Sequence, residues 1–190
     1  SEFVGQTALS HDDLMVRAEY LYGKLWNMQR VTGMRLPIYL MITKCDLVPG
    51  FESFCRSIPT HNRHDLFGWS NDEAVDVVYN SSWIDLAFAS INASLYRAQE
   101  EIYTSSQAID ERNGIFMLPL SFNTLKGGIR TYANHLFKES SYHESFFLRG
   151  LYFVGDSHLE RPLSLKANSA LNLGYEADPL RRNIYFADTI

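Results

Sequence analysis

Ile38–Ile42 reads IYLMI, a run in which every residue is apolar, and the tetrapeptide Thr43–Asp46, TKCD, follows it directly. A strand with one face in water alternates apolar and polar residues, whereas a strand of a parallel sheet is covered on both faces and is apolar throughout. The run therefore predicts a strand buried on both sides in a mostly parallel sheet. In open sheets of this kind, ligands bind beyond the carboxyl ends of the strands, so a site is expected at the tetrapeptide.

Helical periodicity is found on both sides of this strand. Ser10 and Asp13 have the spacing of a capping box, and the apolar residues after them predict a helix over about 11–31 that Gly33 ends. The turn at Pro49-Gly50 predicts a short helix over about 51–56, and the polar segment 58–80 predicts a loop. A second capping-box spacing, Ser82 and Asp85, precedes the clearest helix, over about 83–104.

The second half of the chain continues the alternation of helices and strands. The run 115–118, IFML, predicts a second buried strand that ends at Pro119, and a helix is expected over about 122–138. Leu148–Val154 predicts a third strand, and the mixed sequence after it has no clear organisation. Helices that alternate with short, fully apolar strands indicate an α/β fold with a mostly parallel sheet and flanking helices.

Composition excludes several classes of protein. The net charge is −5 and the pI about 5.6, so there is no electrostatic reason to expect nucleic-acid binding. No stretch approaches the roughly 20 apolar residues that span a bilayer. Two cysteines, Cys45 and Cys55, are too few for a disulfide framework and are expected to be reduced thiols. Cys55 with His61 and His64 lacks a fourth metal ligand, so we expect no metal site.

Thr43-Lys44-Cys45-Asp46 resembles the [N/T]-K-x-D motif with which GTPases recognise guanine. In such a site, Asp46 could accept two hydrogen bonds from the base, Lys44 could lie along its face, and Thr43 could hold the turn. The second base-contacting motif of GTPases corresponds here to Leu120-Ser121-Phe122, so Ser121 completes the expected set. The tetrapeptide is also compatible with a structural turn, in which Asp46 caps the helix that begins near Phe51 or bonds to its own backbone.

The other half of a nucleotide site is missing from these residues. Most of the binding energy for a nucleotide comes from a glycine-rich phosphate loop and a magnesium-ligating aspartate. No G-x-x-x-x-G-K-[ST] pattern is present, and Gly127-Gly128 follows Lys126 rather than preceding it. No nucleophile, base and acid can be grouped, so no catalytic residue is predicted. Because the run 184–190 ends within an apolar pattern, we expect a longer protein.

Four segments together resemble the cytoplasmic region of the IcmF/TssM family of type VI and related secretion systems. The most specific are Arg35–Phe51, which contains the tetrapeptide, and Leu148–Phe153, an arginine-glycine-aromatic strand. Ile115–Phe122 and Asn183–Asp188 match less specifically. Val154-Gly155-Asp156-Ser157-His158 stands where the family usually has a Ser-Gly-Thr-like loop, which suggests a divergent member.

The resemblance implies a GTPase-like domain that lacks its phosphate-loop half, over residues 4–160, with 161–190 as an extension. It also implies a place on the cytoplasmic face of the bacterial inner membrane, with membrane spans outside this chain. The implied partners are a smaller membrane protein of the TssL/DotU type and baseplate components. GTP or ATP with magnesium is an implied ligand of the longer protein, and none is required by these residues.

Two classes of function remain. The first is a scaffold, in which the domain lends its surface to the membrane core complex. The second is a nucleotide-dependent switch or NTPase whose phosphate-binding half lies upstream. We favour the scaffold, because the phosphate and metal contacts that supply most nucleotide affinity are not in this sequence. These residues alone are not expected to be an enzyme, and hydrolysis by the longer protein stays open.

Overall fold

A computed structural model of the chain describes residues 10–58, 66–104, 112–140 and 144–155. In chain order, the elements are α1 (His11–Thr32), β1 (Pro37–Ile42), a 3-10 helix (Cys45–Leu47), α2 (Phe51–Ser57), β2 (Gly68–Ser70), α3 (Ser82–Thr104), α4 (Arg112–Asn123), α5 (Leu125–Leu136) and β3 (Phe147–Phe153). The extension 161–190 and the His61/His64 pair lie outside the described residues.

The sheet has three strands in the order β1-β3-β2. β1 and β3 are parallel, as expected, but β2 pairs with β3 in the antiparallel direction. The α/β class is therefore confirmed, and the prediction of a mostly parallel sheet is wrong for the described residues. The error comes from β2, which the sequence analysis assigned to a loop: three residues, Gly68-Trp69-Ser70, give no periodicity that reveals a strand.

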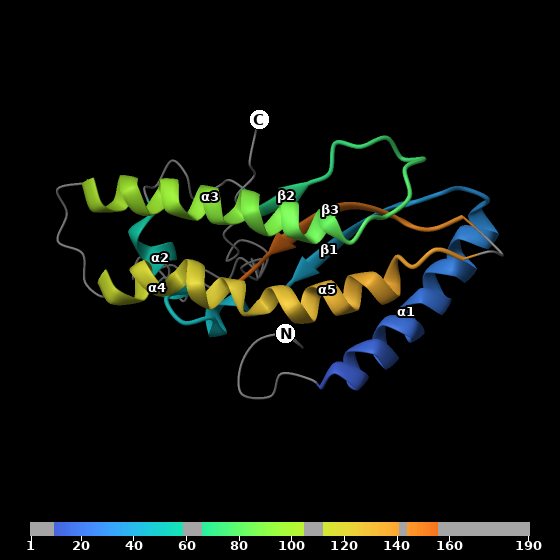
Figure 1. The fold of residues 1–190 in the computed structure, drawn as a ribbon, viewed down its shortest axis with the longest axis horizontal. Coiled ribbons are helices and arrows are strands. Elements are labelled where there is room, and N and C mark those ends of the chain that lie inside the picture. Colours follow the sequence, from blue (N-terminus) through green and yellow to red (C-terminus); the bar gives the residue numbers. More distant parts are fainter. Residues whose placement is uncertain (1–9, 59–65, 105–111, 141–143, 156–190) are drawn as a thin grey trace, which may run out of the picture.

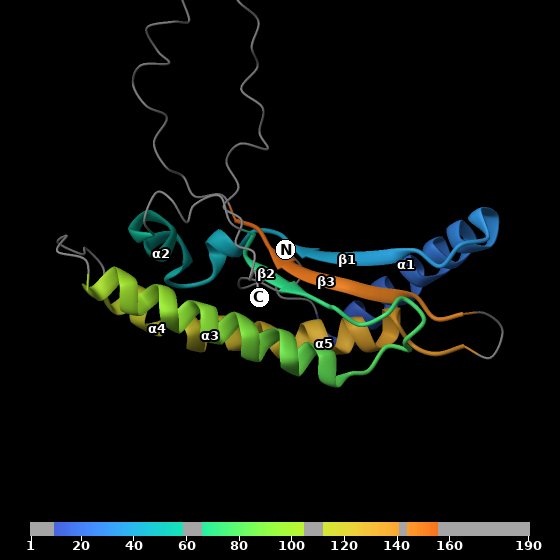
Figure 2. The ribbon, with the colours of Figure 1, turned by 90° about the horizontal axis from the view of Figure 1, so that it is seen from above.

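The helices form a layer on one face of this sheet. Figure 2 shows α3, α4 and α5 along one face of the three strands, and Figure 1 shows α4 and α5 end to end beside α3, with α1 crossing at one end of the molecule. The core lies between the two layers, where large apolar side chains from the helices meet those of the central strand β3. Fully buried members include Phe88, Phe122, Phe137, Phe147 and Phe153.

The capping box predicted at the start of α1 has its N-cap hydrogen bond, whereas a different residue caps α3. At α1, Ser10 caps as expected, because its hydroxyl accepts a hydrogen bond from the Asp13 N–H at 3.2 Å. At α3, the side chain of Asn80 accepts from the Ser82 N–H at 2.9 Å. Asp85 instead pairs with Arg130 and, at 2.7 Å, with Lys126 of α5. The hydrogen bond from Lys126 lowers the pKa of the Asp85 carboxyl.

The strand predicted over 115–118 is wrong, because these residues belong to helix α4. Ile115, Leu118 and Phe122 are fully buried at helical spacing, whereas Phe116 and Leu120 are exposed. A four-residue apolar run fits a buried strand and a helix face equally well, and here packing against α3 decides for the helix. The predicted helix over 122–138 is found as α5, with its start three residues later.

Pro119 lies inside α4 and lacks the N–H that would bond to the carbonyl of Ile115 four residues earlier. The buried side-chain amide of Gln99 on α3 donates a hydrogen bond to this same carbonyl oxygen. Leaving a buried carbonyl without a donor costs about 1–3 kcal/mol. Gln99 therefore supplies from a neighbouring helix the donor that the proline removes.

We expect Gln99→Met to lower the free energy of unfolding by about 1–3 kcal/mol, because it leaves the Ile115 carbonyl without a donor. In a Pro119→Ala background, the new backbone N–H can bond that carbonyl, so the same substitution should cost clearly less. Urea titrations of the four proteins in this double-mutant cycle give the coupling. An equal cost in both backgrounds would contradict the proposed compensation.

Candidate functional site

The tetrapeptide Thr43–Asp46 lies where the carboxyl ends of β1 and β3 meet. The Val154 N–H donates to the Ile42 carbonyl at 2.8 Å, and the Cys45 N–H donates to the Val154 carbonyl at 3.1 Å. These two bonds extend the parallel pairing beyond the last residues of both strands. The loop is therefore fixed to the central strand, at the edge of the sheet where ligands bind in open α/β folds.

The backbone turns sharply at Lys44, which has a φ of 62° in the left-handed region. This conformation is uncommon for a residue with a side chain and is often found at binding sites. Thr43 and Lys44 are exposed, while Asp46 is half-buried in the 3-10 helix. The N-cap of α2 is Gly50, so Asp46 does not occupy the capping position that the structural reading of the motif predicted.

Cys45 packs the Thr43–Asp46 loop against the core. Its side chain is fully buried, and Sγ lies 3.4 Å from the Ile42 carbonyl oxygen. Burial raises the pKa of this thiol to about 12, so it stays neutral near pH 7. A neutral, enclosed thiol is a packing group rather than a nucleophile or a metal ligand.

Gly155, which the sequence analysis did not select, closes the other side of the loop. A Cβ at this position would lie 2.8 Å from the Asp46 nitrogen and 2.5 Å from the ring of Phe51. Only glycine therefore allows the chain after β3 to pass this close to the loop. The Phe51 ring in turn stacks near Phe122, with 6.4 Å between centroids, so the site rests on the aromatic core.

Ser121 is placed differently from the other three predicted residues. It was expected to follow a strand, but it lies within α4, where its carbonyl accepts a hydrogen bond from the Thr124 hydroxyl at 2.6 Å. The structure thus brings Thr43, Lys44 and Asp46 together on one loop, and gives Ser121 a helical setting unlike that of a second base-contacting motif. A role for these four residues in binding a base stays a prediction.

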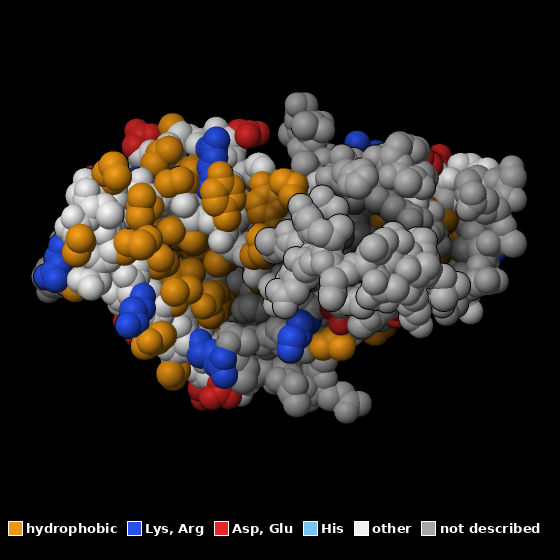
Figure 3. Space-filling view, turned by 180° about the vertical axis from the view of Figure 1, so that it is seen from behind, with side chains coloured by type: hydrophobic (Ala, Val, Ile, Leu, Met, Phe, Trp, Pro, Cys, Tyr) orange, Lys and Arg blue, Asp and Glu red, His pale blue; other side chains and the backbone are white. Residues whose placement is uncertain are grey.

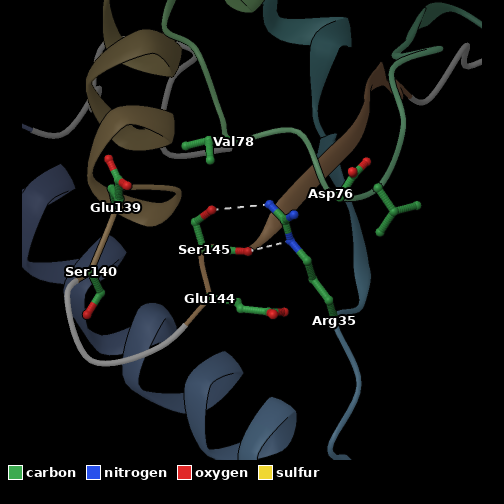
Figure 4. Close-up of a pocket in the computed structure, with 8 residues that line it drawn as sticks. Arg35, Asp76, Val78, Glu139, Ser140, Glu144 and Ser145 are labelled. Atoms are coloured by element: carbon green, nitrogen blue, oxygen red, sulfur yellow. Dashed lines mark hydrogen bonds between the residues drawn. The ribbon is translucent and has the colours of Figure 1, made fainter.

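A pocket of about 430 Å³ lies at the opposite end of the sheet, where Arg35 precedes β1 and Ser145 precedes β3. Figure 4 shows the Arg35 side chain reaching toward Ser145. Arg35 donates to the Ser145 carbonyl at 2.7 Å, to its hydroxyl at 3.1 Å and to the Val77 carbonyl at 3.0 Å. These bonds tie the α1–β1 connection to the β2–α3 connection, through Val77, and to the connection before β3, through Ser145.

The lining of this pocket is charged and partly apolar. It consists of Arg35, Val75, Asp76, Val78, Glu139, Ser140, Glu144 and Ser145. Three carboxylates against one guanidinium leave an excess of negative charge, which disfavours a phosphate group there. The pocket at this end of the sheet therefore does not substitute for a nucleotide phosphate site.

Neither a metal centre nor a membrane span is found in the part of the chain that the structure describes. No three His, Cys, Asp or Glu side chains there lie close enough to hold a metal ion. Within the same residues, no helix combines the length and the apolar character needed to cross a bilayer. The prediction about Cys55, His61 and His64 cannot be followed further, since both histidines lie outside the described ranges.

Comparison with known proteins identifies relatives. Residues 7–187 match the model of the IcmF-related N-terminal domain. The chain is 27% identical over 166 residues to the type VI secretion system component TssM1 of Pseudomonas aeruginosa. This alignment covers 82% of the chain and 15% of the relative. No solved structure gives a significant match. The family match extends over nearly all of the sequence, and the chain therefore belongs to the IcmF-related N-terminal domain family.

Proposed function

We propose that this chain is a scaffold domain of a TssM-type component of a type VI secretion system. The observation that carries the proposal is the similarity to TssM1 over 82% of the chain. The chain spans only 15% of that relative's length, so it would supply one module of a much larger protein. As a module of the membrane core complex, it would lie on the cytoplasmic face of the inner membrane.

A surface suited to partner binding lies on the outside of the helical layer. Tyr96 on α3 is 60% exposed, and Phe116 and Leu120 on α4 are 70% and 62% exposed. Phe116 and Leu120 are one helical turn apart and therefore share a face of α4. The bond from Asn92 to Asn123, at 3.0 Å, holds α3 against α4 beside them. Large exposed apolar side chains on two packed helices favour protein partners.

The occupant we propose for this surface is the smaller membrane partner of the TssL/DotU type, with baseplate components as further partners of the complex. Phe116→Glu and Leu120→Glu are each expected to weaken binding of that partner at least tenfold, because each buries a charge in an apolar contact. Leu86→Glu is the matched control, since Leu86 is exposed to a similar degree on α3, more than two turns from Tyr96. Binding is measured by titrating the purified partner, and function by secretion from cells that carry each variant.

Thermal unfolding of the three variants should match that of the parent protein, because all three side chains lie outside the core. A folded Phe116→Glu protein that binds the partner and supports secretion like the parent would refute this surface. Loss of binding in Leu86→Glu alone would move the interface to the start of α3.

A second candidate function is a nucleotide-dependent switch in a GTPase-like fold. It is favoured by the position of Lys44 and Asp46 on a sharply turned loop at the carboxyl end of β1. In this proposal, Asp46 accepts hydrogen bonds from guanine, and the phosphates and magnesium are held by residues of the longer protein.

The switch is tested with fluorescent GTP and ATP analogues, in the presence of Mg²⁺, on this chain and on a version extended upstream. Binding that prefers GTP and is weakened at least tenfold by Asp46→Ala is the expected result for the extended protein. Asp72→Ala, which removes an exposed carboxylate elsewhere, is the control. No binding to either protein would leave Lys44 and Asp46 as turn residues.

A further inference from the structure

The pocket between Arg35 and Ser145 combines a hollow with an excess of acidic groups. Its volume of about 430 Å³ lies within the range of about 300–1,000 Å³ that is usual for ligand sites. Its lining sets the Arg35 guanidinium against three carboxylates, those of Asp76, Glu139 and Glu144. Figure 4 shows Asp76 and Glu139 on opposite sides of the pocket, with the Arg35 side chain between them. The charge of the hollow therefore favours a positively charged group.

The hydrogen bonds of Arg35 all go to neutral oxygens. Its guanidinium donates to the carbonyls of Ser145 and Val77 and to the Ser145 hydroxyl. Within the described residues, neither Asp76 nor Glu139 takes part in an ion pair. The arginine of the pocket therefore serves to hold the backbone, and the carboxylates keep their capacity to bind a cation from outside.

The β2–α3 connection beside the pocket adds further acidic groups. Asn71, which is 2% exposed, donates to the Leu148 carbonyl at 3.0 Å and accepts from the Glu73 N–H at 3.1 Å. Arg149 donates to the Glu73 carbonyl at 3.2 Å, so the connection is bonded to β3. Figure 3 shows acidic side chains at the upper left edge of the rear face, which corresponds to the upper right of Figure 1, where this connection lies. The exposed acidic residues of the connection are Asp72, Glu73 and Asp76.

Two valines give the pocket an apolar wall. Val75 and Val78 are 43% and 46% exposed, and both line the hollow. Lysine and arginine side chains pack their aliphatic stems along apolar surface and keep the charged head among polar groups. No three acidic, histidine or cysteine side chains of the described residues lie close enough to hold a metal ion. An apolar wall with carboxylates around it therefore fits a basic side chain better than an inorganic cation.

We propose that the pocket and the 71–78 connection form an acidic surface that docks a basic segment of a protein partner, with one of its arginine or lysine side chains in the pocket. Complementary charge speeds association and disfavours wrong partners. Because the connection is already bonded to β3, little ordering is needed when the partner binds.

The acidic surface is separate from the apolar surface proposed above as a partner contact. It precedes α3, whereas the backbone of Phe116 lies beside Gln99 in the second half of that helix (Figure 1). The charge of the acidic surface therefore selects its own partner, and this inference does not depend on which protein covers Phe116 and Leu120.

The test measures binding of a fluorescein-labelled tetra-arginine peptide to this chain by fluorescence anisotropy. The parent protein is compared with the double variant Asp76→Asn/Glu139→Gln. The matched control is Asp12→Asn/Glu100→Gln, which removes two exposed carboxylates from the start of α1 and from α3. Both double variants have the same net charge, so general attraction between an acidic protein and a basic peptide is equal in the two.

At about 50 mM salt, we expect Asp76→Asn/Glu139→Gln to bind the peptide about fivefold more weakly than the parent, and the control to bind like the parent. A tetra-citrulline peptide, which is the neutral counterpart, should not bind. Thermal unfolding of both double variants should match the parent, because all four residues are exposed.

Three results would overturn the proposal. The first is no measurable binding of the tetra-arginine peptide to the parent. The second is equal weakening by the two double variants, which would leave only general charge attraction. The third is binding of N-acetylarginine amide as tight as that of the tetra-arginine peptide, which would assign the pocket to a small organic cation rather than to a protein segment.

Discussion

Replacing Phe122 by Ala is expected to lower the free energy of unfolding by about 3–5 kcal/mol, the usual cost of removing a buried aromatic ring. Phe122 is fully buried on α4, and its ring lies near three rings, on α2, just before β2 and on β3. The centroid distances are 4.7 Å to Phe153, 5.2 Å to Phe67 and 6.4 Å to Phe51. The cavity would therefore open between the helical layer, β3 and the base of the candidate site.

Phe116→Ala provides the matched control for this prediction. Phe116 lies on the same helix but is 70% exposed, so its truncation should change stability by no more than about 0.5 kcal/mol. Urea titration monitored by circular dichroism measures both variants. Similar losses for Phe122→Ala and Phe116→Ala would show that the two faces of α4 have been assigned wrongly.

The same helix shows why the sequence predicted only part of the fold. The periodicity of α1 and α3 extends over more than 20 residues each, and both helices are found almost where they were expected. IFML at 115–118 offered four residues, too few to separate a period of 3.6 from a period of 2. A longer stretch of sequence would have favoured the helix, because Phe122 continues the helical spacing of Ile115 and Leu118 past Pro119.

The candidate site was predictable as far as local sequence determines it. Thr43, Lys44 and Asp46 could be placed directly after β1, because an apolar run that ends in polar residues indicates the carboxyl end of a strand. The contribution of Gly155 was not predictable, because it depends on how closely the chain after β3 approaches Asp46. Ser121 was misplaced for a related reason: its assignment depended on a strand that the packing of α3 against α4 replaces with a helix.

β1 shows a different kind of disagreement between sequence and structure. Its uniform apolar pattern predicted burial on both faces, whereas the described residues cover only one. Local propensity and tertiary environment usually agree in natural proteins. The described residues give this strand less cover than its apolar pattern predicts, since the side chains of Tyr39 and Met41 are exposed.

Gly50→Ala is expected to lower the free energy of unfolding by about 3 kcal/mol, through two separate effects. Gly50 has a φ of 88°, a conformation that costs an alanine about 1–2 kcal/mol. A Cβ at this position would also overlap the backbone carbonyl of Gly114 on α4, and relief of such overlap costs about 1–3 kcal/mol. Backbone atoms cannot move aside as a flexible side chain can, so α2 and α4 must separate.

Gly23→Ala separates these effects from the general consequence of adding a methyl group. Gly23 lies in the middle of α1 with open space around it, so alanine there should stabilise the protein by about 0.5–1 kcal/mol. Opposite signs in the two urea titrations are the expected result, and a stable Gly50→Ala protein would contradict the described approach of α2 to α4. Because Gly50 lies between the Thr43–Asp46 loop and α2, its substitution should also speed hydrogen exchange at the Cys45 amide, which ties the helix contact to the candidate site.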